Sequence, residues 1–519
     1  MTRWLLPFML VPFFGMTQIP ILDNTHRLFV EYQNIENDTL DHKPFFGFVL
    51  PDKTEKLEGG VFNKSKNEGV NNIEVQLLLN TALGLNSSNA AAGLVLSGQF
   101  KKWSFYIAPS VGLYQNNQWV KRQTEFNYIQ NNQTILSKNK SGMVGFSSPF
   151  AVQYKPSKYF TFSGGVGKQF IGEGQRSILL TDFSKNHPYL SVVTEVWKLK
   201  YINLISGYYY DQNSEPTFYL PNKFSTTHYL SWDVFKWLNI GAFETVMWKS
   251  QDTLLNRGID VNYLNPVIFY RPVEYSTGSS DNVLMGITGT IKIRKKLKIY
   301  SQLLIDEFLL KYISADIKHA INPNAVTAEP TGWWGNKHSG QAGFKWFDAF
   351  NLDGLIVRGE VNYSRPYTYS HLNPSESYSH FNSPLAHPLG ANFNEWMVNL
   401  NYIQNNWAFE GYFNYRKKGF DFPINYSQNQ LNGPIVSGNY GGNVINSYNT
   451  RVNEFGTFTG QGNTYSYSTI GIKAGYFLNP EINLKAFVHV AAIFTTAGKV
   501  QEVIRIGVST NLYNSYFDL

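Results

Sequence analysis

A stretch near residue 390 carries side chains that could hydrolyse a substrate. In SPLAHPLGANFNEW, Ser383 and His387 lie four residues apart. A serine hydroxyl beside a histidine is the arrangement of a nucleophile activated by a general base. Ser383 is not flanked by a nucleophile elbow, however, and the sequence places no acid beside His387. We therefore expect His387, Asn392 and Glu395 to anchor a loop by hydrogen bonds, next to a surface where a sugar could bind.

Histidines in the same region raise the question of a metal site. His371, His380 and His387 fall within one predicted loop, and neutral imidazole is a common zinc ligand. Their spacings of nine and seven residues fit neither one face of a helix nor a short chelating motif. We predict structural or sugar-contacting histidines, with no metal and no other cofactor.

Charged residues gather in three further stretches, at Glu173, Arg176, Arg271, Glu274, Asp306 and Glu307. Paired carboxylates about 5–10 Å apart could hydrolyse a glycoside. Arginines in the same stretches favour a different interpretation, in which ion pairs and hydrogen bonds hold inward-folded loops. A glycan-binding surface is the second interpretation, and catalysis is the least favoured, so we predict no enzymatic activity.

The segment GEGQRS contains the G-x-G element of phosphate-binding loops. No strand–helix unit follows it, and no Lys-Ser/Thr pair completes such a loop. We expect Gly172 and Gly174 to supply positive φ angles in a turn instead.

Aromatic residues are frequent in the predicted outer loops, at Trp333, Trp334, Tyr367, Tyr369 and Tyr378. Aromatic rings stack on the apolar faces of sugars, but they also form belts at membrane interfaces. The sequence leaves carbohydrate contact and structural packing equally open.

Composition indicates the elements that must position these residues. Of the 519 residues only 16% are charged, against about 25% in soluble domains, while 16% are aromatic and the mean hydropathy is −0.27. Few charges, many aromatics and no net hydrophobicity are typical of a transmembrane β-barrel. Such a barrel has an apolar outer face, a polar lumen and aromatic girdles.

Apolar and polar residues alternate along many segments. In LKIYSQLLID, for example, Leu297, Ile299, Leu303 and Ile305 oppose a polar face that includes Lys298. Soluble β-sandwiches alternate too, but these segments are longer than the usual five or six residues. We count about 18 strands, which start near residues 72, 90, 103, 145, 158, 190, 200, 225, 238, 281, 297, 338, 354, 395, 407, 466, 482 and 500.

The connections alternate in length, which indicates which end of the barrel faces the periplasm and which faces the outside. Tight turns, such as those at 101–102, 156–158 and 405–406, alternate with long segments, such as 308–337 and 366–394. Short periplasmic turns and long outer loops are the pattern of an outer-membrane barrel. The fold class is therefore all-β: a transmembrane, antiparallel, up-and-down β-barrel whose ordered outer loops fold inward.

Three regions follow along the chain. Residues 1–18 have the basic start and short apolar stretch of a signal peptide. Residues 19–70 alternate poorly, and we expect a periplasmic or lumenal segment with a short helix at 26–35. Residues 71–519 form the barrel. The net charge of +7 suits a surface that faces anionic glycans or lipids. The lysines and arginines are scattered along the chain, which does not suit nucleic-acid binding. The chain has no cysteine, which excludes zinc sites formed by thiolates.

Several segments within residues 145–420 carry a resemblance to a known family. They are VGKQFIGEGQRSILLTD, THYLSWDVFKWLNIGAFE, NYLNPVIFYRPVEYSTGSSDN, QLLIDEF, WWGNK, RPYTYSH and PLAHPLGANF. In order and spacing this part resembles the Wzi-type outer-membrane proteins linked to capsule assembly, closest to the RemB-type proteins of gliding bacteria. The resemblance implies an 18-stranded barrel in the outer membrane, with a surface-polysaccharide or motility role and no enzymatic activity.

The sequence thus predicts an outer-membrane barrel that engages surface polysaccharide, supports gliding, or both. A porin or sugar-selective channel is the alternative, and an outer-membrane hydrolase is less favoured. Expected partners are outer-membrane lipid, surface polysaccharide and other envelope or motility proteins, but not nucleic acid. The candidate glycan-binding residues are Glu173, Gln175, Arg176, Arg271, Glu274, Trp333, Trp334, Arg365, Tyr367, Tyr369, His371, His387 and Asn392.

Overall fold

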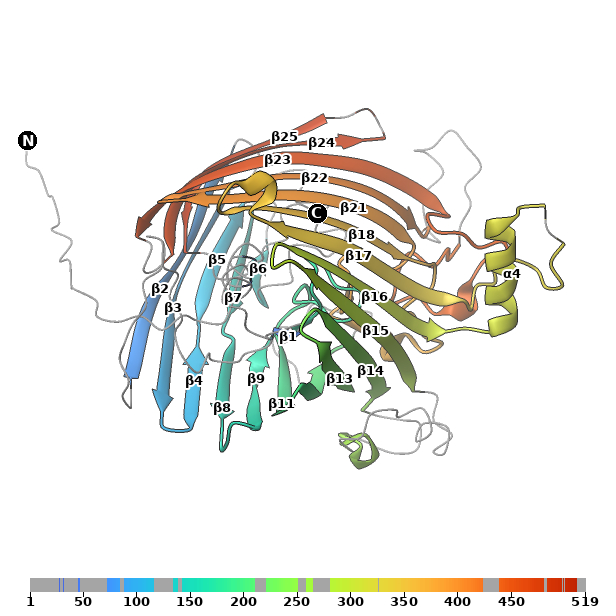
Figure 1. Cartoon of the computed structure of the whole chain (residues 1–519), viewed down its shortest axis with the longest axis horizontal. Coiled ribbons are helices and arrows are strands. Elements are labelled where there is room, and N and C mark those ends of the chain that lie inside the picture. Colours follow the sequence, from blue (N-terminus) through green and yellow to red (C-terminus); the bar gives the residue numbers. More distant parts are fainter. Residues whose placement is uncertain are drawn as a thin grey trace, which may run out of the picture.

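Antiparallel strands close into one barrel in the computed structural model (Figure 1). The structure describes residues 28, 31, 45–46, 72–84, 88–115, 134–138, 142–210, 221–250, 258–264, 281–324, 326–422, 438–479, 483–496, 498 and 500–510. The expected signal peptide lies outside these residues, and the division into regions at residues 18 and 70 stays a prediction.

The wall has 18 strands, as the sequence predicted. They are β2 (Asn72–Gly84), β3 (Ser88–Phe100), β4 (Trp103–Ile107) with β5 (Ser110–Gln115), β7 (Gly142–Ser147) with β8 (Phe150–Tyr154), β9 (Phe160–Gly167), β11 (His187–Val196), β12 (Leu199–Tyr208), β13 (Lys223–Phe235), β14 (Leu238–Lys249), β15 (Asn282–Ile293), β16 (Leu297–Glu307), β17 (Lys337–Phe347), β18 (Leu355–Ser364), β21 (Phe393–Gln404), β22 (Trp407–Phe420), β23 (Asn463–Asn479), β24 (Leu484–Thr495) and β25 (Val500–Ser509). β25 pairs with β2 and closes the barrel.

Prolines divide two neighbouring strands of the wall at the same level. Pro109 separates β4 from β5, and Pro149 separates β7 from β8. Proline cannot donate a ladder hydrogen bond, so a continuous strand is interrupted at each position. The main chains stay joined, because the Ala108 amide donates to the Pro149 carbonyl at 2.9 Å and the Leu94 amide donates to the Pro109 carbonyl at 3.1 Å.

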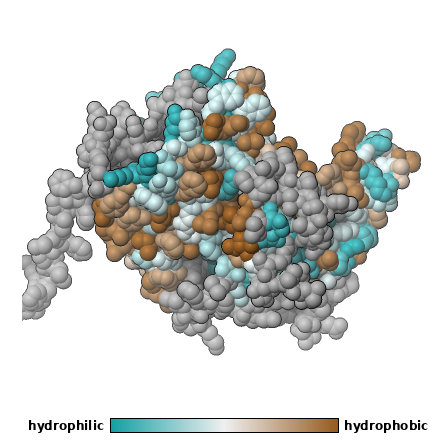
Figure 2. Space-filling view, turned by 90° about the horizontal axis from the view of Figure 1, so that it is seen from below, coloured by the Kyte–Doolittle hydropathy of each residue, from teal (hydrophilic) through white to brown (hydrophobic). Residues whose placement is uncertain are grey.

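The alternation along each strand separates a lipid face from a lumenal face. On β16, Ile299 is 41% exposed on the outside, whereas Lys298 and Gln302 are buried inside. Exposed tryptophans, among them Trp103, Trp197 and Trp237, cluster at the short turns. Figure 2 shows apolar side chains spread over the outer wall. An apolar wall with an aromatic girdle is the surface that a lipid bilayer requires, and the barrel belongs to the bacterial outer membrane.

Three outer segments fold into the lumen, and we name them the plug loops: residues 168–186, 365–392 and 438–462. The sequence predicted inward folding for the first two and not for the third. The first contains β10 (Phe170–Ile171), and the second contains η4 (Pro374–Glu376), β19 (Ser379–His380) and β20 (Ser383–Pro384). The third contains η5 (Tyr448–Thr450). Ile178, Leu179 and Leu180 are fully buried and pack in one apolar cluster with residues of the wall and of the other two plug loops.

Part of the N-terminal region also lies inside the barrel. The described residues Leu28 and Glu31 are helical, within the helix predicted at 26–35. Leu28 is buried against Phe347 and Ile356, next to short turns of the wall. Further along, β1 (Phe45–Phe46) pairs with β10. The described residues thus contact the inside of the wall and the first plug loop, and the location of residues 19–70 as a whole stays a prediction.

The remaining elements are short. β6 (Thr134–Lys138) pairs with β7, η2 (Val261–Leu264) follows β14, and η3 (Ala349–Asn351) forms a turn before β18. The helix α4 (Leu310–Ile321) lies between β16 and β17, where the sequence predicted only a loop. Within the described residues, no helix is long and apolar enough to span a membrane.

Candidate functional site

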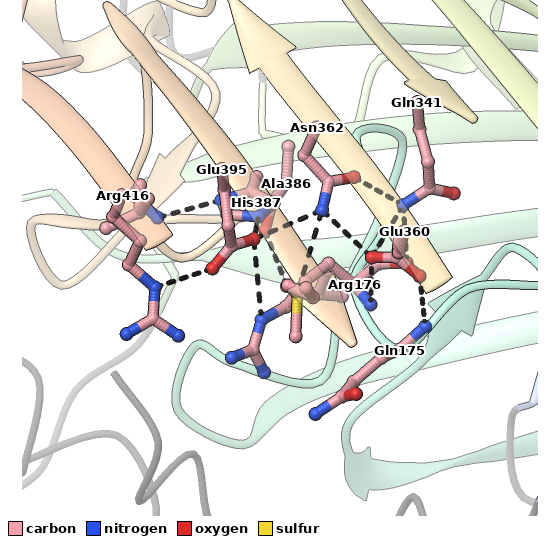
Figure 3. Close-up of polar contacts among 12 residues, drawn as sticks. Gln175, Arg176, Gln341, Glu360, Asn362, Ala386, His387, Glu395 and Arg416 are labelled. Atoms are coloured by element: carbon pink, nitrogen blue, oxygen red, sulfur yellow. Dashed lines mark hydrogen bonds and ion pairs between the residues drawn. The ribbon is translucent and has the colours of Figure 1, made fainter. Parts of the chain in front are cut away.

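Two buried glutamates of the wall hold the first two plug loops (Figure 3). The first is Glu360 on β18, which accepts hydrogen bonds from the amides of Gln175 at 2.7 Å and Arg176 at 3.2 Å. Three side chains of the wall, those of Tyr300, Gln341 and Asn362, also donate to this carboxylate. Glu360 thus accepts from five donors, which balances the cost of burying its charge.

The GEGQRS segment forms a cradle for this carboxylate. A Cβ atom on Gly174 would lie 2.5 Å from Glu360 Oε2 and 2.6 Å from the Arg176 carbonyl oxygen. Gly174 is therefore required by a close approach; the prediction that it supplies a positive φ angle is wrong. Gly172 does have a positive φ, of 150°. The resemblance to a phosphate-binding loop has a physical basis, because both present backbone amides to an anion.

The second glutamate is Glu395, at the start of β21. Its Oε1 accepts from Arg416 Nε at 2.6 Å, and its Oε2 accepts from His387 Nε2 at 2.8 Å and from Asn362 Nδ2 at 3.1 Å. Arg176 Nε lies 4.0 Å from the same carboxylate. Asn362 donates to both glutamates, so one continuous network links β18, β21, β22 and the first two plug loops (Figure 3).

His387 has no ring nitrogen available to act as a base for Ser383. The Leu389 amide donates to Nδ1 at 3.1 Å, so the ring proton lies on Nε2, which donates to Glu395. Burial lowers the pKa of the imidazole below its usual value, despite the nearby carboxylate. The Ser383–His387 nucleophile–base pair considered from the sequence does not form, and His387 anchors the loop as expected.

The three histidines of the second plug loop have separate partners. His371 Nδ1 lies 3.1 Å from Glu376, His380 Nδ1 accepts from the Tyr209 amide, and His387 contacts Glu395. Within the described residues, no three histidine, aspartate or glutamate side chains are grouped so that they could hold a metal ion.

Glu173 belongs to a charge cluster deeper in the lumen. Lys298 Nζ lies 2.6 Å from Glu173 and 2.6 Å from Glu31 of the N-terminal segment. Lys345 also pairs with both glutamates. The cluster joins the N-terminal segment, the first plug loop and the wall.

Several other residues predicted to contact glycan are buried, and their side chains form hydrogen bonds within the protein. Asn392 donates to three backbone carbonyls, Tyr367 donates to the Asn439 carbonyl, and Tyr369 donates to the Ile178 carbonyl. Gln175 accepts from Arg358. A surface polymer cannot reach side chains that are enclosed in this way. Arg271 and Glu274 lie outside the described residues.

Trp333 and Trp334 are half-buried and belong to a row of rings on the outer side, which we name the aromatic strip: Tyr312, Trp333, Trp334, Tyr448 and Phe455. Neighbouring ring centroids lie 4.8 Å apart for Tyr312 and Trp333, 5.8 Å for the two tryptophans and 4.8 Å for Trp334 and Tyr448. Phe455 packs against Tyr312 at 5.6 Å. The strip is drawn from α4, the WWGNK turn and the third plug loop.

Two arginines hold the tryptophans of this strip in place. Arg451 lies over the Trp334 ring, 4.3 Å from its centroid. Arg365 donates to the Trp333 carbonyl at 3.2 Å and to Thr457 at 3.1 Å. His371, which the sequence predicted as a glycan contact, packs its ring against Tyr448, with the ring centroids 6.0 Å apart.

The sequence singled out the two tryptophans of this strip as candidates, but not Tyr312, Tyr448, Phe455 or Arg451. The missed residues come from a helix and a loop that the sequence did not place beside WWGNK. The one available signal was the high density of aromatic residues in the outer loops.

Comparisons with known proteins bear on the fold. No protein-family model and no curated protein matches the chain. Among solved structures, Wzi of Escherichia coli, described as a carbohydrate-binding β-barrel involved in group 1 capsule assembly, is 10% identical with a TM-score of 0.50, covering 85% of this chain and 84% of its own. OprD of Pseudomonas aeruginosa is 9% identical with a TM-score of 0.41, covering 88% and 98%. OpdK of the same organism, solved with vanillate, is 10% identical with a TM-score of 0.44, covering 84% and 98%.

Proposed function

Starting from an outer-membrane β-barrel with the fold of Wzi, we propose that this protein binds surface polysaccharide on the aromatic strip and does not work as an open channel. The solved Wzi structure is described as a carbohydrate-binding barrel involved in capsule assembly. The observation that carries the proposal for this chain is the strip itself.

Half-exposed rings on a fixed support suit a carbohydrate. The C–H faces of a sugar ring are apolar, and they pack on aromatic faces, while hydroxyl groups at the edge accept and donate hydrogen bonds. Arg451 lies over the Trp334 ring and Arg365 holds the Trp333 carbonyl, so the two tryptophans are fixed before a sugar arrives. Neighbouring rings contact one another along the strip, so an extended polymer can contact more than one ring at once.

The plug loops support the second half of the proposal. An open channel needs a continuous water path, yet Ile178, Leu179 and Leu180 are fully buried in an apolar cluster within the lumen. The third plug loop also presents Tyr448 and Phe455 of the aromatic strip to the outside. A porin, the alternative function, lacks comparable support among the described residues. Support of gliding motility has no residue that argues for it and stays an expectation.

Binding of purified protein to surface polysaccharide extracted from the producing cells tests the proposal. We expect Trp333→Ala and Trp334→Ala each to weaken binding by about 1 kcal/mol, or roughly fivefold, because each removes one ring contact. Trp237→Ala, at an exposed short turn on the opposite side of the membrane, is the matched control. Equal affinities for all three variants and the unmodified protein would contradict the assignment of the strip.

A further inference from the structure

The helix α4 has two faces of opposite character. One face is docked on the barrel's outer loops: Asp316 accepts from the Gly332 amide at 2.7 Å and from Asn336 Nδ2 at 2.9 Å. Tyr312, on the same side of the helix, packs on Trp333. These contacts fix the rotation of the helix about its own axis.

The opposite face is apolar and uncovered. Leu310 is 74% exposed, Ile317 is 54% exposed and Ile321 is 81% exposed. Positions seven and eleven residues apart lie on one side of a helix, so these three side chains form a stripe. A continuous exposed apolar stripe of this kind marks a surface that is covered in the working protein.

The stripe continues the lipid-facing side of the wall. Ile299, Leu303 and Ile305 form the outer face of β16, and Leu309, which is 45% exposed, follows just beyond the end of that strand. α4 begins at the next residue and lies at the right edge of Figure 1, beyond the ends of β16 and β17. Figure 2 shows apolar side chains at this edge of the molecule beside hydrophilic ones.

The charges that flank the stripe suit a lipid headgroup. Lys311 and Lys318 are exposed and lie about 90° around the helix from the stripe; Lys311 also pairs with the partly exposed Glu329 at 3.2 Å. An amphipathic helix with cations at its border lies in the membrane interface, with its apolar residues among the acyl chains and its cations near phosphates.

We propose that α4 lies on the outer leaflet of the membrane and inserts Leu310, Ile317 and Ile321 among the acyl chains. The helix then works as an interfacial anchor. Because Tyr312 belongs to both α4 and the aromatic strip, the anchor also fixes the height of the strip above the bilayer.

The absence of cysteine from the chain permits a direct test. Single-cysteine variants Ile317→Cys and His319→Cys, the second exposed on the docked side, are labelled with a polarity-sensitive fluorophore. The labelled proteins are reconstituted into phosphatidylcholine–phosphatidylglycerol vesicles with and without brominated acyl chains. We expect brominated lipid to quench the label at 317 about threefold more strongly than the label at 319, and iodide in the buffer to show the reverse order.

Equal access of iodide to both labels in vesicles would overturn the proposal. A label at 317 that is exposed in these vesicles but protected in native outer membranes would also overturn it, because a protein or polysaccharide would then cover the stripe. Heat-modified electrophoretic mobility identifies variants that have not formed the barrel. Both positions are on the helix surface, so neither label disturbs the wall.

Discussion

At the scale of single residues, this protein uses an anion-binding loop for an internal carboxylate. Amides of Gln175 and Arg176 face Glu360, as amides face phosphate in a nucleotide-binding loop. The motif therefore contributes to the attachment of the plug, and the anion that it binds belongs to the same chain.

The substitution Gly174→Ala tests this attachment. Its Cβ would approach Glu360 Oε2 to 2.5 Å, so we expect the variant to lose about 1–3 kcal/mol of stability through overpacking. The midpoint of urea unfolding, followed by tryptophan fluorescence in detergent, measures the loss. Gly411→Ala is the control, because its nearest neighbour would be Leu400 Cβ at 3.9 Å. Unchanged midpoints for both variants would show that the cradle tolerates a side chain.

The sequence predicted where these residues lie and that they anchor loops, but it did not predict their hydrogen-bond partners. It placed Glu173 and Arg176 in or above the lumen and assigned loop anchoring to His387, and the structure agrees. It could not predict that Glu360 is the acceptor for Gln175, because the two residues are 185 positions apart and only closure of the barrel brings them together. For the same reason it offered several buried side chains as surface contacts.

At the scale of elements, strands were predictable and the helix α4 was not. Apolar and polar residues alternate along each strand, as from Leu297 to Ile305, because one side of the strand faces lipid and the other faces the lumen. This alternation predicted the starts of the strands to within a few residues. Leu310, Ile317 and Ile321 have helical spacing, but three apolar residues within a long polar connection do not by themselves predict a helix. Short helices in outer loops depend on docking contacts, here those of Tyr312 and Asp316.

Glu31 ties the N-terminal segment to the wall of the barrel. Glu31→Gln removes one of the two carboxylates that pair with the buried Lys298 and Lys345. We expect a loss of about 3 kcal/mol, because a buried cation loses a partner. Faster hydrogen exchange around residues 28–31 and a lower urea midpoint would report it. Glu195→Gln is the control, since Glu195 is 49% exposed in its pair with Lys200. Identical exchange in the two variants would contradict a role for Glu31 in holding the segment.

At the scale of the whole molecule, the barrel encloses an apolar core inside a polar lining. Its wall is apolar towards lipid and polar towards the lumen, and the plug loops then add buried residues such as Leu179 and Leu385. We expect the purified protein to give no steady open-channel current in planar bilayers and no solute-driven swelling of liposomes. A known porin reconstituted alongside is the positive control. Large, steady currents from the unmodified protein would favour the channel function instead.

The inward course of the plug loops also limits how the cell surface can change. Surface loops generally vary more in sequence than the elements that they connect. Here the arms of the same loops hold Glu360 and Glu395 in the interior, so substitutions in them cost stability. Exposed positions such as Val326 and Phe458 are not under this constraint, so the part of the loops that can change freely is the part that any external binder meets.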